Sequence, residues 1–280
     1  MKFASKKFIL LALFIGAFLK ANAQLSKQGV TFQGVDDTDM GYLRQLGLVA
    51  FFDASQGVMT NSSGRVVTWN DISGNGYKFV NYGGTGPTFD PAHSTNAFPA
   101  LVFQATRPMF CHDLAQFFTG KKPVTLMSLS IGQVSGSQAA IAAGYTSAIS
   151  SGASHMTIRK SSSPPTSVGL YMGVDTNTGA DFSVGGGGTT SNVFSYTGYY
   201  INTNETARSC NNLTFSGIQT IPGGTLTLNT FTIGARSGTN ANLQSGWTGG
   251  ISQLLIFSNV MTATQFTNTV KELNRKRKVF

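Results

Sequence analysis

Short runs of β-branched and aromatic residues recur along this chain, and turn-forming residues separate one run from the next. The clearest run, residues 225–233 (TLTLNTFTI), largely alternates hydroxyl and apolar side chains, as a half-buried strand does. Glycine-rich turns such as residues 73–76 (SGNG) and 222–224 (PGG) separate the runs. Many short strands at this spacing predict a β-sandwich or barrel.

Ten segments have this strand-like composition, and only 11% of all residues are charged. They are residues 48–52, 65–69, 100–103, 124–131, 156–159, 168–172, 193–201, 213–215, 225–233 and 251–257. One helix is predicted after Thr262, where Gln265 completes a capping-box pattern and apolar residues then recur at helical spacing. A second, weaker helix is predicted over residues 40–45.

The first 23 residues have the order of a secretory signal peptide: an early cluster of lysines, an apolar run over residues 8–19, and small residues ending at Ala23. The apolar run of twelve residues is shorter than the roughly 20 that a membrane-spanning helix needs. We therefore expect cleavage between Ala23 and Gln24, and a secreted or cell-envelope protein. The predicted organisation is a signal peptide at 1–23, a leader segment at 24–45 and one domain at 46–280.

The formal charge of +9 is concentrated at the two ends of the chain. Between Gln24 and Val270 there are 11 basic and 10 acidic residues, so the body is nearly neutral. Nucleic-acid binding would require Lys and Arg spread over a surface, and it is not expected here.

Several motifs resemble the laminin G-like domains of exported bacterial and phage proteins, which belong to the concanavalin A-like lectin/glucanase superfamily. They are residues 48–55 (LVAFFDAS), 66–76 (VVTWNDISGNG), 98–103 (FPALVF), 231–236 (FTIGAR) and 247–257 (WTGGISQLLIF). The resemblance runs from about residue 46 to the carboxyl terminus, with a poorly matched middle between residues 121 and 220. It implies an all-β, two-sheet antiparallel jelly-roll sandwich with a C-terminal α-helix.

Some relatives of this fold are glycoside hydrolases, which usually need two carboxyl groups. The Glu-x-Asp-x-x-Glu strand of the jelly-roll glucanases is absent, because the positions that follow Glu205 carry Ala207 and Cys210. The consecutive Cys111, His112 and Asp113 are unsuited to a catalytic triad, since adjacent side chains rarely converge. We therefore expect no enzyme and no catalytic residue.

The expected function is binding of carbohydrate on a cell surface or in an extracellular matrix. Aromatic residues near predicted strand ends are the candidate sugar contacts, with packing as the alternative for each: Tyr171, Tyr199, Tyr200 and Trp247. The alternative function is a structural or adhesive protein that binds another protein, such as a component of a surface appendage or virion.

No cofactor is expected. If the domain does hold calcium, the candidate ligands are Asp53 and Asp71 in its turn-rich first part. Asp71 is also expected to accept backbone N–H bonds in the turn that follows it, where Gly74 and Gly76 permit positive φ. Cys111 and Cys210 leave two outcomes open: a disulfide, if the fold brings them together, or two buried free thiols.

Overall fold

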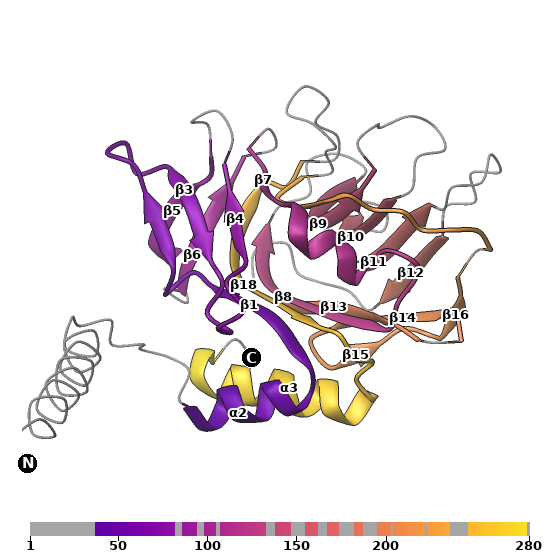
Figure 1. Cartoon of the computed structure of the whole chain (residues 1–280). Helices are drawn as coiled ribbons and strands as arrows, with labels where there is room; N and C mark the ends of the chain where they lie inside the picture. Colours follow the sequence, from indigo (N-terminus) through magenta and orange to yellow (C-terminus); the bar gives the residue numbers. More distant parts are fainter. Residues whose placement is uncertain are drawn as a thin grey trace, which may run out of the picture. The chain divides into compact units, whose positions relative to one another are not determined.

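The computed structural model describes residues 37–81, 86–93, 98–104, 107–132, 138–146, 155–161, 167–173, 182–186, 195–202, 204–221, 223–235 and 246–278. All of them belong to one compact unit, and its strands form two antiparallel sheets (Figure 1). The predicted signal peptide and most of the predicted leader lie outside the described residues. No helix among the described residues is both long enough and apolar enough to cross a membrane.

The first sheet, sheet A, has the strand order β15-β14-β13-β8-β18-β6-β5, with β1 also paired to β18 and β16 to β14. Its strands are β1 (Leu48–Asp53), β5 (Thr88–His93), β6 (Phe98–Phe103), β8 (Val124–Gly132), β13 (Ser195–Ile201), β14 (Thr206–Asn211), β15 (Thr214–Phe215), β16 (Gln219–Thr220) and β18 (Gly249–Phe257).

The second sheet, sheet B, has the order β12-β11-β10-β9-β17-β7-β4-β3-β2. Its strands are β2 (Val58–Thr60), β3 (Val66–Asn70), β4 (Lys78–Val80), β7 (Met109–Cys111), β9 (Gln138–Tyr145), β10 (His155–Ser161), β11 (Ser167–Gly173), β12 (Phe182–Gly186) and β17 (Thr230–Ile233). Apolar side chains from both sheets form one core between them, which includes Phe52, Trp69, Phe79 and Phe231.

Two α-helices cover the other face of sheet A (Figure 1). Helix α3 (Ala263–Arg277) begins with the predicted capping box: the Gln265 backbone N–H donates to Thr262 Oγ1 at 3.1 Å, and Gln265 Oε1 accepts from the Thr262 N–H at 2.9 Å. Its predicted apolar stripe is buried, and a Cβ added at Gly198 of β13 would lie 2.8 Å from Cζ of Phe266. Gly198 therefore lets the helix approach the sheet closely.

The weaker predicted helix is present as α2 (Asp37–Gln45). Met40 and Leu43 are buried, and the Arg44 guanidinium donates to the backbone carbonyl of Ser73 at 3.0 Å. The last nine residues of the predicted leader segment therefore pack on the domain.

The prediction of one continuous strand over residues 225–233 is wrong in its first half, because only Thr230–Ile233 pairs as β17. Leu226 and Leu228 are nevertheless buried. Leu228 packs against Gly144 of β9, and the Leu226 carbonyl accepts the Gly120 N–H at 2.7 Å. The alternating pattern therefore reflects burial of Leu226 and Leu228 against neighbouring segments, although residues 225–229 do not pair as a strand.

Candidate functional site

An open cleft of about 440 Å³ lies where the short 3₁₀-helix η1 (His112–Phe117) is beside the segment that leads into β17. Its volume falls in the range of ligand-binding clefts, roughly 300–1,000 Å³. Its polar lining residues are His112, Asp113, Gln116, Thr119, Lys122 and Asn229, and Ala115 and Leu228 add apolar surface.

Hydrogen bonds join the chain segments that line this cleft. Thr119 Oγ1 donates to the Leu228 carbonyl at 2.9 Å and accepts the Leu228 N–H at 3.1 Å, which ties the turn after η1 to the segment before β17. His112 Nδ1 lies 3.2 Å from Thr230 Oγ1. At the rim, Lys122 Nζ donates to the Gln116 carbonyl at 3.1 Å.

The lining side chains combine both hydrogen-bonding roles within one cleft. The Lys122 ammonium donates, the Asp113 carboxylate accepts, and the Gln116 and Asn229 carboxamides can do both. His112, Asp113 and Gln116 are exposed to solvent. A ligand with many hydroxyl groups, each of which both donates and accepts, matches this set.

A pair of half-buried aromatic rings lies near Asp113. Tyr77 and Phe117 make an edge-to-face contact, with ring centroids 5.9 Å apart. Burial raises the pKa of the Tyr77 hydroxyl, and the charges of Asp71, Cys111 and Asp113 act in the same direction. Neither ring was among the aromatic candidates chosen from the sequence.

Two of those candidates are wrong, because their side chains are in the core. Tyr199 and Trp247 are fully buried, and the Tyr199 hydroxyl donates to Sδ of Met156 at 3.0 Å. Tyr200 is half-buried on β13, where it pairs with Arg208 and Thr125, and it does not line this cleft. Tyr171 lies on β11, and its side chain is outside the described residues.

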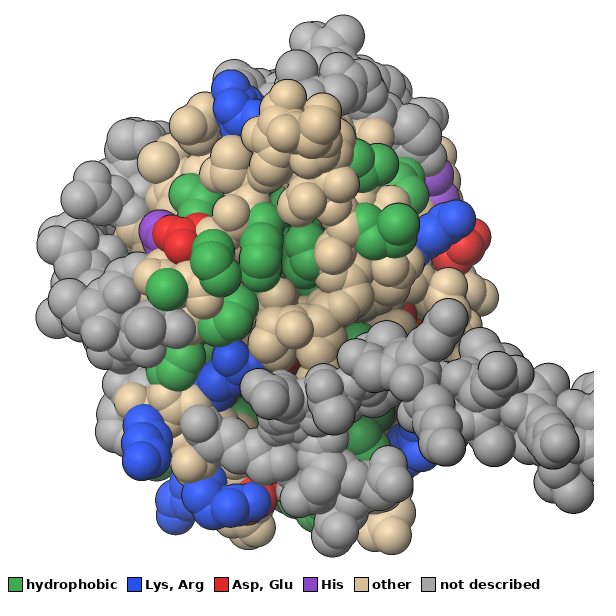
Figure 2. Space-filling view, turned by 90° about the vertical axis from the view of Figure 1, so that its left-hand side faces the viewer, with side chains coloured by type: hydrophobic (Ala, Val, Ile, Leu, Met, Phe, Trp, Pro, Cys, Tyr) green, Lys and Arg blue, Asp and Glu red, His purple; other side chains and the backbone are tan. Residues whose placement is uncertain are grey.

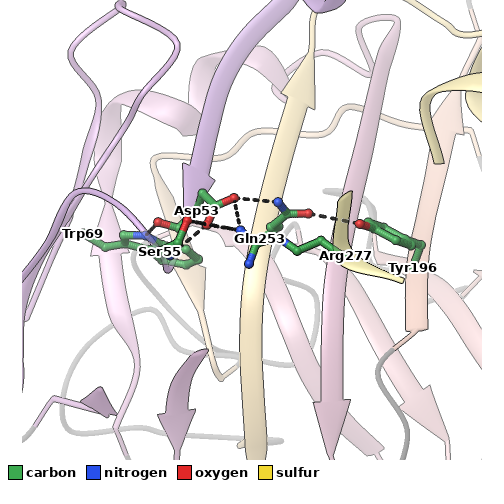
Figure 3. A network of polar contacts seen from close by, with 6 residues as sticks. All are labelled: Asp53, Ser55, Trp69, Tyr196, Gln253 and Arg277. Carbon is green, nitrogen blue, oxygen red and sulfur yellow. Dashed lines mark hydrogen bonds and ion pairs between the residues drawn. The ribbon is translucent and has the colours of Figure 1, made fainter. Parts of the chain in front are cut away.

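Asp53, a calcium candidate, is instead the centre of a buried polar network (Figure 3). Both of its carboxylate oxygens lie 2.6 Å from a guanidinium nitrogen of Arg277, and one of them accepts from Gln253 Nε2 at 2.6 Å. Ser55 donates its backbone N–H and its hydroxyl to the other oxygen, at 2.8 and 2.5 Å. These partners leave Asp53 serving as a structural anchor for α3.

The network continues across sheet A on one row of residues. Gln253 is paired in register with Asp53 on β1 and with Leu129 on β8, which in turn pairs with Tyr196 on β13. The Tyr196 hydroxyl donates to Gln253 Oε1 at 3.3 Å. Burial raises the pKa of this hydroxyl well above its ordinary value, so it remains a donor.

Asp71, the other calcium candidate, organises the turn as expected. Its Oδ1 accepts the backbone N–H groups of Phe51 and Ser73, both at 2.8 Å, and its Oδ2 accepts the Ser73 hydroxyl at 2.7 Å. Gly74 and Gly76 have φ of 97° and 79°, as predicted. Among the described residues, no three His, Cys, Asp or Glu side chains gather as a metal site.

The cysteines are two buried free thiols, so the disulfide outcome is not the one found. Cys111 is on β7 of sheet B, and Cys210 is on β14 of sheet A. Burial raises the pKa of Cys111 to about 11, although backbone N–H groups donate to it, and raises that of Cys210 to about 12.

No protein-family model matches the chain, and no curated protein matches it in sequence. Solved structures with a similar fold include the NanB sialidase of Streptococcus pneumoniae (TM-score 0.50, 12% identity, 60% of this chain and 27% of that one). A second is the Trypanosoma rangeli sialidase (TM-score 0.55, 10% identity, 82% and 33%). A third is botulinum neurotoxin type C, whose cell entry depends on interaction with two ganglioside molecules (TM-score 0.55, 9% identity, 82% and 53%).

This chain therefore matches about a quarter to a half of the length of these neighbours. At such low identity the similarity establishes architecture alone. The protein has the fold of an all-β, two-sheet antiparallel sandwich with a C-terminal helix.

Proposed function

We propose that this protein is an exported, non-catalytic module that binds carbohydrate, and that it is a laminin G-like member of the concanavalin A-like superfamily. The observation that carries the proposal is the η1 cleft, in which His112, Asp113, Gln116, Lys122 and Asn229 combine donors and acceptors. Carbohydrate-active proteins and a ganglioside-dependent toxin among the structural neighbours support it at the level of fold.

The chemistry of the acidic and sulfur groups supports a binding role without catalysis. Glu205 pairs with Lys121, and Glu272 pairs with Arg275 on α3, so the two glutamates belong to different parts of the fold. Cys111, with its pKa raised to about 11, remains a thiol at neutral pH, and a thiol is a poor nucleophile.

Export by cleavage of a signal peptide between Ala23 and Gln24 is part of the proposal, with a secreted or cell-envelope location. Intact-mass measurement of protein recovered from outside the cytoplasm tests it. The measured mass should be that of a chain that begins at Gln24. A mature protein that retains residues 1–23 would contradict this part.

The binding role is tested by a glycan-array screen of the mature chain, run with calcium and again with chelator. Gln116→Ala and Lys122→Ala should lose the signals that the unmodified protein gives, while Met59→Ala, a control on β2, should keep them. Because Asp53 and Asp71 already use their oxygens within the protein, the signals should survive chelation. Array signals unaffected by both cleft variants would contradict this site.

An adhesive or structural role through another protein is the second candidate, favoured by exposed apolar side chains on the β2–β3 hairpin. Met59 is 59% exposed and Val67 43%, and β2 is the edge strand of sheet B. Figure 2 shows hydrophobic side chains gathered on the side of the molecule where β3 and β5 lie. If the array gives no signal, and Met59→Lys abolishes an association seen by light scattering, this candidate replaces the first.

A further inference from the structure

We infer that the η1 cleft continues over the Lys122–Pro123 rim into a second cleft, and that the protein binds a linear oligosaccharide that spans both. The inference rests on the proposed function and names its ligand class: an internal stretch of a glycan chain rather than a single terminal sugar.

The second cleft has a volume of about 410 Å³ and lies where the end of α2, the start of β8 and the β18–α3 connection meet. Four of its lining residues carry carboxamides: Gln45, Asn202, Asn259 and Gln265. Pro123 and Met261 are among its apolar residues, and none of the described residues that line it is charged. Carboxamides both donate and accept hydrogen bonds, so this cleft suits an uncharged polyhydroxy ligand.

The two clefts are lined by consecutive residues of the chain. Lys122 lines the first cleft and Pro123 lines the second. Lys122 is exposed and Pro123 is half-buried, so a glycan that crosses the rim meets an ammonium group and then an apolar ring.

Lys121, the residue before the rim, is buried and ion-paired. This residue has a left-handed backbone, with φ of 54°, and its side chain is only 4% exposed. Its ammonium lies 3.4 Å from the carboxylate of Glu205, which is also left-handed, with φ of 53°. Before Lys121, the Gly120 N–H donates to the Leu226 carbonyl. After the rim, Val124 of β8 pairs with Ile201 of β13.

Because the residues of the rim are ordered before binding, the protein itself loses little conformational entropy when a glycan chain is laid across it. The different linings also limit the ligand. The first cleft offers Lys122 and Asp113, whereas the carboxamide cleft offers no charge to balance a sulfate or carboxylate. The ligand portion in the second cleft is therefore neutral.

The test is isothermal titration of the purified protein with length series, from monosaccharide to hexasaccharide, of cellulose, xylan, mannan, β-1,3-glucan and chitin. For the series that binds, affinity should rise at least about tenfold between the disaccharide and the pentasaccharide, as the second cleft becomes occupied. Gln45→Ala and Asn259→Ala should remove this gain and leave disaccharide affinity unchanged, and Met59→Ala should change neither.

Two results separate failure of this inference from failure of the proposed function. A series whose affinity is constant from the disaccharide onward, and indifferent to Asn259→Ala, overturns the extended site and leaves glycan binding intact. Absence of binding by every series at millimolar concentration counts against both. Thermal melting of each variant checks that it is folded, and Gln45, exposed at the end of α2, is the substitution least able to disturb the fold.

Discussion

The Arg277 guanidinium lies 2.6 Å from both carboxylate oxygens of Asp53, a residue 224 positions earlier in the chain. Asp53 is fully buried, and the Arg277 side chain is 12% exposed. The pair joins the last turn of α3 to the end of β1, so the helix is anchored by charge at this end and by Phe266 nearer its start.

Removing one member of this pair should destabilise the protein strongly. Arg277→Met leaves the Asp53 carboxylate buried without its counter-charge, and we expect a loss of about 3 kcal/mol or more in the free energy of unfolding. Urea unfolding measures it. Arg275→Met, which removes an exposed arginine two residues away, should change stability by less than about 1 kcal/mol. Equal effects of the two substitutions would show that the buried pair is not the anchor.

The close approach of α3 to β13 makes Gly198 intolerant of a side chain. In Gly198→Ala the new Cβ would lie 2.5 Å from the Leu126 carbonyl oxygen and 2.8 Å from the Phe266 ring, so we expect a destabilisation of about 1–3 kcal/mol. Gly217→Ala is the matched control, because nothing lies within 4 Å of its Cβ. Thermal melting of the two variants should separate them by several degrees, and coincident melting curves would contradict this packing.

Both thiols should be unreactive in the native protein. Cys111 and Cys210 are buried and their pKa values are raised to about 11 and 12, so at pH 8 almost no thiolate is available. Titration with a thiol-specific reagent should detect no reactive group before denaturation and two afterwards. If neither cysteine reacts in denatured protein that has not been reduced, Cys111 and Cys210 form a disulfide.

Chelation should leave the thermal stability unchanged. The Asp53 carboxylate accepts from Arg277 and Gln253, and the Asp71 carboxylate accepts from Phe51 and Ser73, so we expect neither to hold calcium. Differential scanning calorimetry with calcium and with EDTA should give the same melting temperature. A rise of several degrees with calcium would point to a site elsewhere in the chain.

Features that depend on neighbouring residues could be predicted from the sequence. The capping box of Thr262 and Gln265 spans one helical turn, and the Asp71 turn spans a few residues, so local patterns specify both. The strand periodicity predicted the sandwich and most of its long strands. It did not find short strands such as β7 or β16, which exist only through their partners.

The polar network and the η1 cleft depend on contacts between segments that are distant in the sequence, and local sequence patterns did not predict these contacts. Asp53 meets Arg277, and η1 meets the segment before β17, only after the sheets have paired. One error was avoidable: side chains alternate along β13, so Tyr199 and Tyr200 must point to opposite faces and only one of them could be exposed. The buried one is Tyr199.

The pairing of β1 with β18 has a consequence for how the chain reaches its native state. All six residues of β1 are buried, and its ladder partner lies about 200 residues later. While the chain emerges from the ribosome, this apolar segment stays without its partner strand until β18 has been made. Contacts between residues so far apart in the sequence slow folding and prolong the exposure of apolar surface. Completion of the sandwich is thereby postponed until β18 is available, and β1 is an unpaired apolar strand for all of that interval.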